Sequence, residues 1–239
     1  MIENTATKKE QVRNMFNNIA LRYDFLNHFL SFGIDYYWRR RVLNLAKKIN
    51  PQEIIDIATG TGDLAIALAK TNPKNILGVD ISSSMLEKGK EKIHKKSLSN
   101  LIEMQLGDSE NLLLKENTFD LATVAFGVRN FEDLKKGLSE ILRVLKPGGS
   151  LIILEFSHPK SFPIKQLYSF YSFKILPIIG KLVSNDASAY TYLPESVAKF
   201  PCYNELTNIM EACGFIDTSY ISLTGGIASI YIAKKDILQ

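Results

Sequence analysis

The stretch Ile54–Ile66, which reads Ile-Ile-Asp-Ile-Ala-Thr-Gly-Thr-Gly-Asp-Leu-Ala-Ile, constrains the fold of this chain more than any other. Its β-branched residues predict a strand, and the Ala- and Leu-rich residues after the glycines predict a helix. Gly60 and Gly62 lie between them, where glycine allows a tight turn and a close approach of backbone to a ligand. The stretch therefore predicts a strand, a glycine turn and a ligand-binding helix N-terminus.

Strands and helices alternate along the chain after residue 52. The pattern predicts strands near 53–57, 76–80, 101–106, 119–125 and 150–156, and helices near 63–71, 83–96 and 131–145. Alternation at this spacing is typical of a parallel, doubly wound sheet. The runs 215–223 and 227–233, joined through Thr224-Gly225-Gly226, predict a closing hairpin. We therefore expect an α/β fold with a mostly parallel, seven-stranded sheet that ends in an antiparallel hairpin.

The chain is expected to form a single domain. Its parts are N-terminal helices at 1–50, a cofactor-binding core at 51–156, a helical insertion at 157–201, and a closing helix and hairpin at 202–239. Outside the core, helices are predicted near 8–30, 38–49, 164–176 and 196–214. The insertion is rich in aromatic and aliphatic residues. It is interpreted either as a buried extra helix or as a lid that lines an apolar pocket or leans on a membrane.

Acidic residues mark the carboxyl ends of three predicted strands. Asp56 ends the first strand, Asp80 ends the second, and Asp108 with Ser109 follows the third. Because parallel strands end at one edge of the sheet, these side chains are expected to meet at one crevice. Asp80 is suited to bind ribose hydroxyls, and Asp108 is suited to accept a hydrogen bond from an adenine amino group.

Two cofactors use such a layout. Gly60, Gly62 and, about 20 residues later, Asp80 fit the dinucleotide pattern G-x-G-x-x-G/A with its acid. A pyrophosphate needs the bare positive end of a helix, however, and Asp56 and Asp63 would each cost on the order of 1–4 kcal/mol there. S-adenosylmethionine carries an ammonium and a sulfonium group and no phosphate. The residues therefore favour this methyl donor, with a dinucleotide or a turn that binds nothing as alternatives.

The loop after the fourth predicted strand, 126–130, reads Phe-Gly-Val-Arg-Asn. In a sheet of this type it faces the transferred group. The Asn/Asp-Pro-Pro-aromatic tetrapeptide that is usual in methylases acting on exocyclic amines is absent. Arg129 directly follows the strand edge and is suited to hold an oxyanion. A salt bridge to an exposed acid is the alternative role for this residue.

Composition and charge limit the partners, the cellular location and the metal sites that we expect. The net charge of +4 does not by itself predict nucleic-acid binding, and we expect no nucleic-acid partner. The N-terminus is polar, and no apolar run approaches the ~20 residues that span a bilayer. Two cysteines are too few for a disulfide framework, which predicts a cytoplasmic protein. The three histidines lack ligand spacing, so no metal site is expected.

Several segments together carry a family resemblance. They are Phe16-Asn17-Asn18-Ile19-Ala20 with Tyr23-Asp24, Asp56-Ile57-Ala58-Thr59-Gly60-Thr61-Gly62-Asp63, Phe126-Gly127-Val128-Arg129-Asn130, Leu145-Lys146-Pro147-Gly148-Gly149 and Tyr192-Leu193-Pro194-Glu195-Ser196. They resemble the menaquinone/ubiquinone C-methyltransferases over nearly the whole chain. The resemblance implies a class I methyltransferase fold. It also implies methyl transfer from S-adenosylmethionine to a ring carbon of a demethylated, prenylated quinol, as from 2-demethylmenaquinol to menaquinol in menaquinone biosynthesis.

The resemblance also assigns site residues. The family's cofactor-binding positions fall on Thr61, Asp80, Asp108 and Ser109, and the glycine segment adds Asp56, Gly60 and Gly62. Three residues match positions that would face the acceptor ring: Tyr23, Arg129 and Asn130. Arg129 would stabilise a phenolate that makes the ring carbon nucleophilic, Tyr23 would relay the proton, and Asn130 would orient the ring.

Several questions stay open at this point. No residue stands out as the general base, and relatives act on naphthoquinols, benzoquinols or both. Methylation of another small apolar molecule at oxygen or nitrogen is the alternative reaction, and a non-catalytic cofactor-binding protein is the alternative class. A homodimer and a peripheral contact with the cytoplasmic face of the membrane are also left open.

Overall fold

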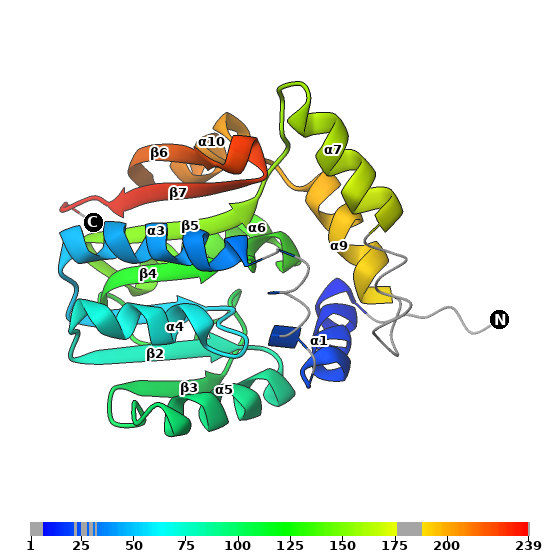
Figure 1. Ribbon diagram of the computed structural model, residues 1–239. Helices are drawn as coiled ribbons and strands as arrows, with labels where there is room; N and C mark the ends of the chain where they lie inside the picture. The colour runs from blue at the N-terminus through cyan, green and yellow to red at the C-terminus, as the bar shows by residue number, and fades with distance from the viewer. Residues whose placement is uncertain are drawn as a thin grey trace.

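The computed structural model describes residues 7–21, 23–24, 28, 31, 33–175 and 188–238 (Figure 1). Its strands are β1 (Glu53–Ile57), β2 (Asn75–Asp80), β3 (Ile102–Leu106), β4 (Phe119–Ala125), β5 (Leu145–Phe156), β6 (Phe215–Leu223) and β7 (Ala228–Lys235). They form one sheet of order β3-β2-β1-β4-β5-β7-β6. β1 to β5 pair in parallel, and β7 runs antiparallel between β5 and β6. The predicted α/β fold is confirmed.

Helices cover both faces of this sheet. The longer ones are α1 (Lys8–Ile19), α3 (Ile34–Ile49), α4 (Asp63–Leu68), α5 (Ser83–Lys95), α6 (Leu134–Val144), α7 (Ile164–Phe170), α9 (Ser188–Lys199) and α10 (Asn204–Ala212). α3, α4 and α5 pack on one face, and α6 and α10 on the other (Figure 1). α1, α7 and α9 lie beyond the carboxyl ends of the parallel strands.

The two faces of the sheet bury separate apolar cores. In β5, Leu151 and Ile153 pack toward α6 and α10, whereas Ile152 and Leu154 pack toward α3 and α4. All four side chains are fully buried. Successive side chains of a strand point to opposite faces, so a continuous apolar run is what a strand covered on both sides requires.

Two helix predictions differ from the structure. The helix predicted at 38–49 begins at Ile34, directly after Gly33, which has a φ of 73°. The single helix predicted at 196–214 is two helices, α9 and α10, because Pro201 cannot donate a helical hydrogen bond and Tyr203 has a positive φ. Helix α10 does end before Gly214, as the sequence indicated.

The strand predicted at 150–156 begins earlier, at Leu145, so residues 146–149 are part of β5. Phe119 of β4 pairs with Leu145 and Leu121 pairs with Ser150, so the residues between Leu145 and Ser150 bulge out of the ladder. The helix predicted at 164–176 is α7 followed by a π-helical turn at Tyr171–Ile175. The helix predicted near 8–30 begins as α1, which ends at Ile19. After residue 21 the structure describes only residues 23–24 and 28 of the predicted range. Residues 176–187 of the insertion lie outside the described residues.

Among the residues that the structure describes, no helix combines the length and apolar character that crossing a membrane requires.

Trp38 of α3 donates to the Thr224 hydroxyl in the turn between β6 and β7, at 2.8 Å. This bond joins α3 to the C-terminal hairpin at the edge of the sheet where the parallel strands end.

Candidate functional site

A cleft with about 670 Å³ of empty space, its open mouth included, lies at the carboxyl ends of the central strands. Six of the ten predicted site residues line it: Tyr23, Gly60, Asp80, Asp108, Ser109 and Asn130. The other four are outside its lining: Asp56, Thr61, Gly62 and Arg129.

The carboxylate of Asp80, at the end of β2, is held in place by backbone N–H groups. One carboxylate oxygen accepts from the Gly60 N–H and the other from the Ser82 N–H, each at 2.8 Å. Burial raises the pKa of Asp80, and these backbone hydrogen bonds oppose the rise. Each oxygen keeps a further lone pair, so the carboxylate can accept from a diol in the cleft.

Asp108, after β3, meets a lysine from the N-terminal helix. Its carboxylate lies 2.7 Å from Lys9 Nζ of α1, and the same ammonium lies 3.1 Å from Glu110. Helix α1 also brings Val12 and Phe16 to the cleft wall. Helix α1 is therefore part of the cleft. The sequence analysis placed Tyr23 of the N-terminal segment at the site but missed Lys9, Val12 and Phe16, because no local pattern links α1 to the strand ends.

Backbone conformations at the ends of β1 and β4 are unusual. Ala58 and Phe126 have φ values of 51° and 57°, in the left-handed region that side chains with a Cβ disfavour. Gly127 follows, and a Cβ there would approach the Ala58 Cβ to 2.5 Å. The two loops are thus packed against each other at the cleft, and strain of this kind is characteristic of functional sites.

Asp56 lies beneath the glycine turn rather than in the cleft. The hydroxyls of Thr59 and Thr123 donate to its two oxygens, both at 2.6 Å. Burial raises the pKa of Asp56 to about 6, against the lowering effect of these hydrogen bonds. The observed role of Asp56 is to hold the turn, and direct contact with a cofactor stays a prediction.

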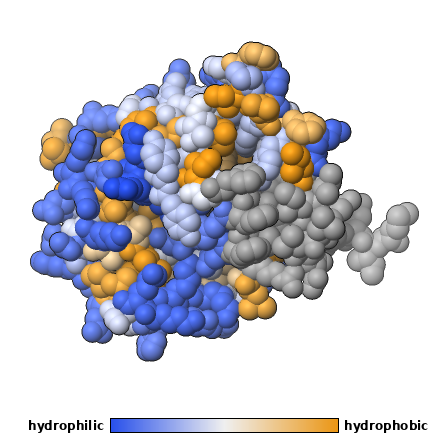
Figure 2. All heavy atoms as spheres, viewed as in Figure 1, coloured by the Kyte–Doolittle hydropathy of each residue, from blue (hydrophilic) through white to orange (hydrophobic). Residues whose placement is uncertain are grey.

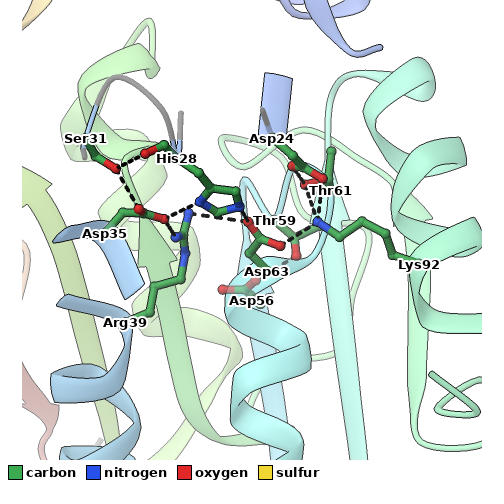
Figure 3. A network of polar contacts seen from close by, with 10 residues as sticks. All are labelled: Asp24, His28, Ser31, Asp35, Arg39, Asp56, Thr59, Thr61, Asp63 and Lys92. Atoms are coloured by element: carbon green, nitrogen blue, oxygen red, sulfur yellow. Dashed lines mark hydrogen bonds and ion pairs between the residues drawn. The ribbon is translucent and has the colours of Figure 1, made fainter. Parts of the chain in front are cut away.

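A polar network links the glycine turn to the N-terminal segment (Figure 3). Thr61 donates to Asp24, and Lys92 of α5 lies within salt-bridge distance of both Asp24 and Asp63. On its other side Asp63 is 3.6 Å from Arg39 of α3. His28 and Asp35 extend the network, with His28 Nδ1 2.7 Å from an Asp35 carboxylate oxygen.

This network changes the electrostatic reason for the cofactor assignment. Asp63 was expected to present a bare carboxylate to the crevice, but cations from α3 and α5 neutralise it. Asp56 is buried behind the turn. The acids that line the cleft are instead Asp80, Asp108 and Glu110, of which the last two share Lys9.

Arg129 forms a buried ion pair next to the cleft. Its Nη1 lies 2.9 Å from Glu155 of β5 and also donates to the Phe126 carbonyl. The guanidinium stands 5.5 Å from the Phe156 ring centroid, and its buried Nε has no hydrogen-bond partner within the ranges that the structure describes. Burial raises the pKa of Glu155, and the charge of Arg129 opposes this rise. The salt bridge is therefore to a buried acid rather than to an exposed one.

Glu155 is a site residue that sequence reasoning missed. The signal was present, because Glu155 is an acid near the end of an apolar strand, like Asp56 and Asp80. Tyr192 of α9 was also missed as a site residue, and its hydroxyl donates to the Asn130 side-chain oxygen at 3.0 Å. Tyr192 therefore connects the insertion to the loop after β4.

A model of the ubiE/COQ5 methyltransferase family matches residues 4–235 of the sequence. The match runs through the N-terminal helices, the sheet and the insertion. The chain belongs to this family. The methyltransferase is 48% identical to the demethylmenaquinone methyltransferase of Bacteroides fragilis, over 97% of this chain and 95% of the relative.

Two further comparisons agree. The "Ubiquinone/menaquinone biosynthesis C-methyltransferase UbiE" of Geobacter sulfurreducens is 45% identical, over 96% of this chain and 90% of its own length. A crystal structure of an S-adenosylmethionine-dependent methyltransferase from Aquifex aeolicus superposes with a TM-score of 0.56 at 20% identity, over 77% of this chain and 81% of that one. At this identity the superposition establishes the fold alone.

The cleft of this methyltransferase fits S-adenosyl-L-methionine, its cofactor. Asp80 offers acceptors for a ribose diol beside the glycine turn, and Ile81 and Met85 supply apolar wall next to Asp108. When bound, the cofactor supplies an activated methyl group on a sulfonium. The protein residues do the rest, by orienting the acceptor and excluding water.

Proposed function

We propose that this methyltransferase methylates a ring carbon of a demethylated, prenylated quinol, with 2-demethylmenaquinol as the expected acceptor. The buried Arg129 beside the end of β4, whose Nε has no partner among the described residues, is the observation that carries the proposal. A guanidinium edge at this place suits an oxyanion on an aromatic ring. The names of the relatives from Bacteroides fragilis and Geobacter sulfurreducens support the same acceptor class.

The proposed chemistry depends on ionising the quinol. A phenolate would push electron density into the ring and make a neighbouring ring carbon nucleophilic toward the methyl group that bound S-adenosylmethionine would supply. The proton of that ring carbon would pass to water, which restores aromaticity. Arg129, held in place by Glu155, would stabilise the phenolate by about 2–4 kcal/mol, the usual contribution of a preorganised donor.

The neighbouring polar groups fit the task of orienting the ring. Asn130 lines the cleft and is held by Tyr192, so its amide has a defined direction. Tyr23 also lines the cleft, with its ring above the glycine turn. We assign Asn130 to orienting the acceptor and Tyr23 to hydrogen bonding or proton relay.

The cofactor assignment follows from the same cleft. Gly60, Asp80, Asp108 and Ser109 line it and are proposed as direct contacts. Asp56, Thr61 and Gly62 are proposed to act through the conformation of the turn, which Asp56 holds through Thr59. We also propose that the enzyme works as one domain in the cytoplasm and meets its acceptor at the membrane surface.

The decisive experiment supplies purified enzyme with methyl-labelled S-adenosylmethionine and, separately, a demethylated naphthoquinol and a demethylated benzoquinol. Mass spectrometry of the product then distinguishes a ring C-methyl group from an O-methyl group by fragmentation. We expect C-methylation of the naphthoquinol. Formation of an O-methyl ether would favour the alternative reaction, and no product from either quinol would contradict the proposal.

A further inference from the structure

Helix α7 has two different faces. On its inner face Ile164 packs over Gly225, in the turn before β7, and Ser172 is buried in the π-helical turn. Tyr168 lies between them on the same face, close enough to Arg129 and Glu155 for their charges to affect its pKa, which burial raises. The inner face is thus directed toward the acceptor end of the site.

The outer face of α7 is apolar and is exposed in the part of the chain that the structure describes. We define it by four side chains on and next to the helix, given with the exposed fraction of each: Phe162 (80%) before it, Leu167 (65%) and Phe170 (60%) in it, and Phe173 (51%) in the π-helical turn after it. Figure 2 shows apolar side chains gathered over α7 at the upper right of the molecule. Large aromatic and aliphatic residues exposed together indicate an interaction surface, whereas a single exposed one does not.

The stretch of sequence that contains α7 carries positive charges and no negative ones. Lys165 and Lys174 are exposed beside the apolar side chains of the outer face. From Ser157 to Asn185 the sequence carries four lysines and no acid. Apolar side chains flanked by lysines match an anionic lipid surface, which takes the apolar groups into its acyl boundary and pairs the cations with phosphates. A second copy of the chain would bring the same positive charges together, which disfavours self-association through this face.

We propose that the outer face of α7 docks this protein on an anionic lipid bilayer. This inference rests on the proposed function in one respect, because a prenylated quinol is held in the bilayer. Docking by the outer face would hold α7 between the lipid and the end of the cleft beside Arg129, so this end of the molecule would be on the membrane side. The acceptor head group would then reach the site while its prenyl chain stays in the membrane.

The test is co-sedimentation of the full-length protein with quinol-free vesicles. One set is phosphatidylcholine, and the other also contains phosphatidylglycerol. We expect binding to the anionic vesicles and a loss of about tenfold or more in the double variant Leu167→Glu, Phe170→Glu, since both the apolar and the electrostatic contributions fall. The matched control is Leu113→Glu, Leu238→Glu, which changes side chains that are 86% and 94% exposed and lie outside the helices and strands. This control should bind as the wild type does.

The outcomes separate the inference from the proposed function. Methylation of a water-soluble quinol with a short side chain should be the same in wild type and the α7 double variant, while methylation of a long-chain quinol in vesicles should fall in the variant. Wild type that stays in the supernatant with anionic vesicles would overturn the docking proposal, whatever its activity. A wild-type dimer that the double variant converts to a monomer in light scattering would assign the face to a second copy instead.

Discussion

The guanidinium of Arg129 is held by Glu155 and the Phe126 carbonyl, and its buried Nε has no partner in the described part of the chain. Its part in catalysis therefore has to be separated from its part in stability. Removing one partner of a buried ion pair leaves an uncompensated charge and costs roughly 3–5 kcal/mol. A single substitution at Arg129 would change both properties at once.

We expect Arg129→Ala to lower turnover by roughly tenfold or more, because a preorganised donor is lost, while the Kd for S-adenosylmethionine stays nearly unchanged. Stability should fall as well. In the double variant Arg129→Ala, Glu155→Gln the buried charge is gone, so urea unfolding should recover much of the lost stability while turnover stays low. If turnover recovered together with stability, Arg129 would have a structural role only.

The buried Asp56 should make the free energy of unfolding depend on pH. Burial raises its pKa from 3.8 to about 6, so the folded state binds this proton more tightly than the unfolded state. The contribution of Asp56 to stability is therefore highest below pH 4 and is lost as the pH rises to 6, by on the order of 3 kcal/mol.

The measurement is urea unfolding of wild type and Asp56→Asn between pH 4 and pH 7. The substitution removes this titration, so the variant should gain stability relative to wild type across the window. Other titrating carboxyls are common to both proteins and cancel in the difference. A difference that is constant with pH would show that Asp56 is not the group responsible.

At the scale of elements, the link between α9 and α10 is held by the C-terminal hairpin. The Tyr203 N–H, at a residue with a φ of 58°, donates to the buried Tyr231 hydroxyl of β7 at 2.8 Å. The side-chain hydroxyl of Tyr203 in turn donates to the His158 carbonyl oxygen at 2.7 Å. These bonds fasten both ends of the insertion to the sheet.

Tyr231→Phe should lower the free energy of unfolding by about 1–3 kcal/mol, because it leaves the buried Tyr203 N–H without an acceptor. The control is Tyr220→Phe, on β6, whose ring packs against the same two tyrosines but is 37% exposed. That variant should differ from wild type by no more than about 0.5 kcal/mol. Equal losses in both variants would show that the loss in Tyr231→Phe does not come from this hydrogen bond.

At the scale of the whole molecule, the cleft couples the N-terminal helix to the sheet. Lys9 of α1 pairs with Asp108 after β3, and Asn17 accepts from the Ser82 hydroxyl after β2 at 2.6 Å. A cofactor that contacts the cleft wall would therefore stabilise the folded chain as a unit.

S-adenosylmethionine at 100 times its Kd should add about 2.7 kcal/mol of stability, which corresponds to a rise in Tm of about 5–10 °C for a chain of this size. NAD at the same concentration should leave the Tm unchanged. Calorimetry with both compounds checks the result. A rise with NAD and none with S-adenosylmethionine would contradict the cofactor assignment.

The sequence by itself determined the sheet, its closing hairpin and the edge at which the cleft lies. These follow from local signals: apolar runs that mark buried strands, glycines that mark the turn, and acids such as Asp80 and Asp108 at strand ends. Strand geometry converts such signals into position, because parallel strands all end at one edge. Five predicted site residues meet there for this reason: Gly60, Asp80, Asp108, Ser109 and Asn130.

Only the tertiary structure decided which charges face the cleft. Asp63 is neutralised by Lys92 and Arg39, and Arg129 is paired with Glu155, through contacts between residues 24 to 29 positions apart in the chain. A sequence pattern shows which groups are present at a strand end, but their net effect depends on the counter-ions that other elements bring. The partners of a side chain are set by packing between elements, which no local pattern records.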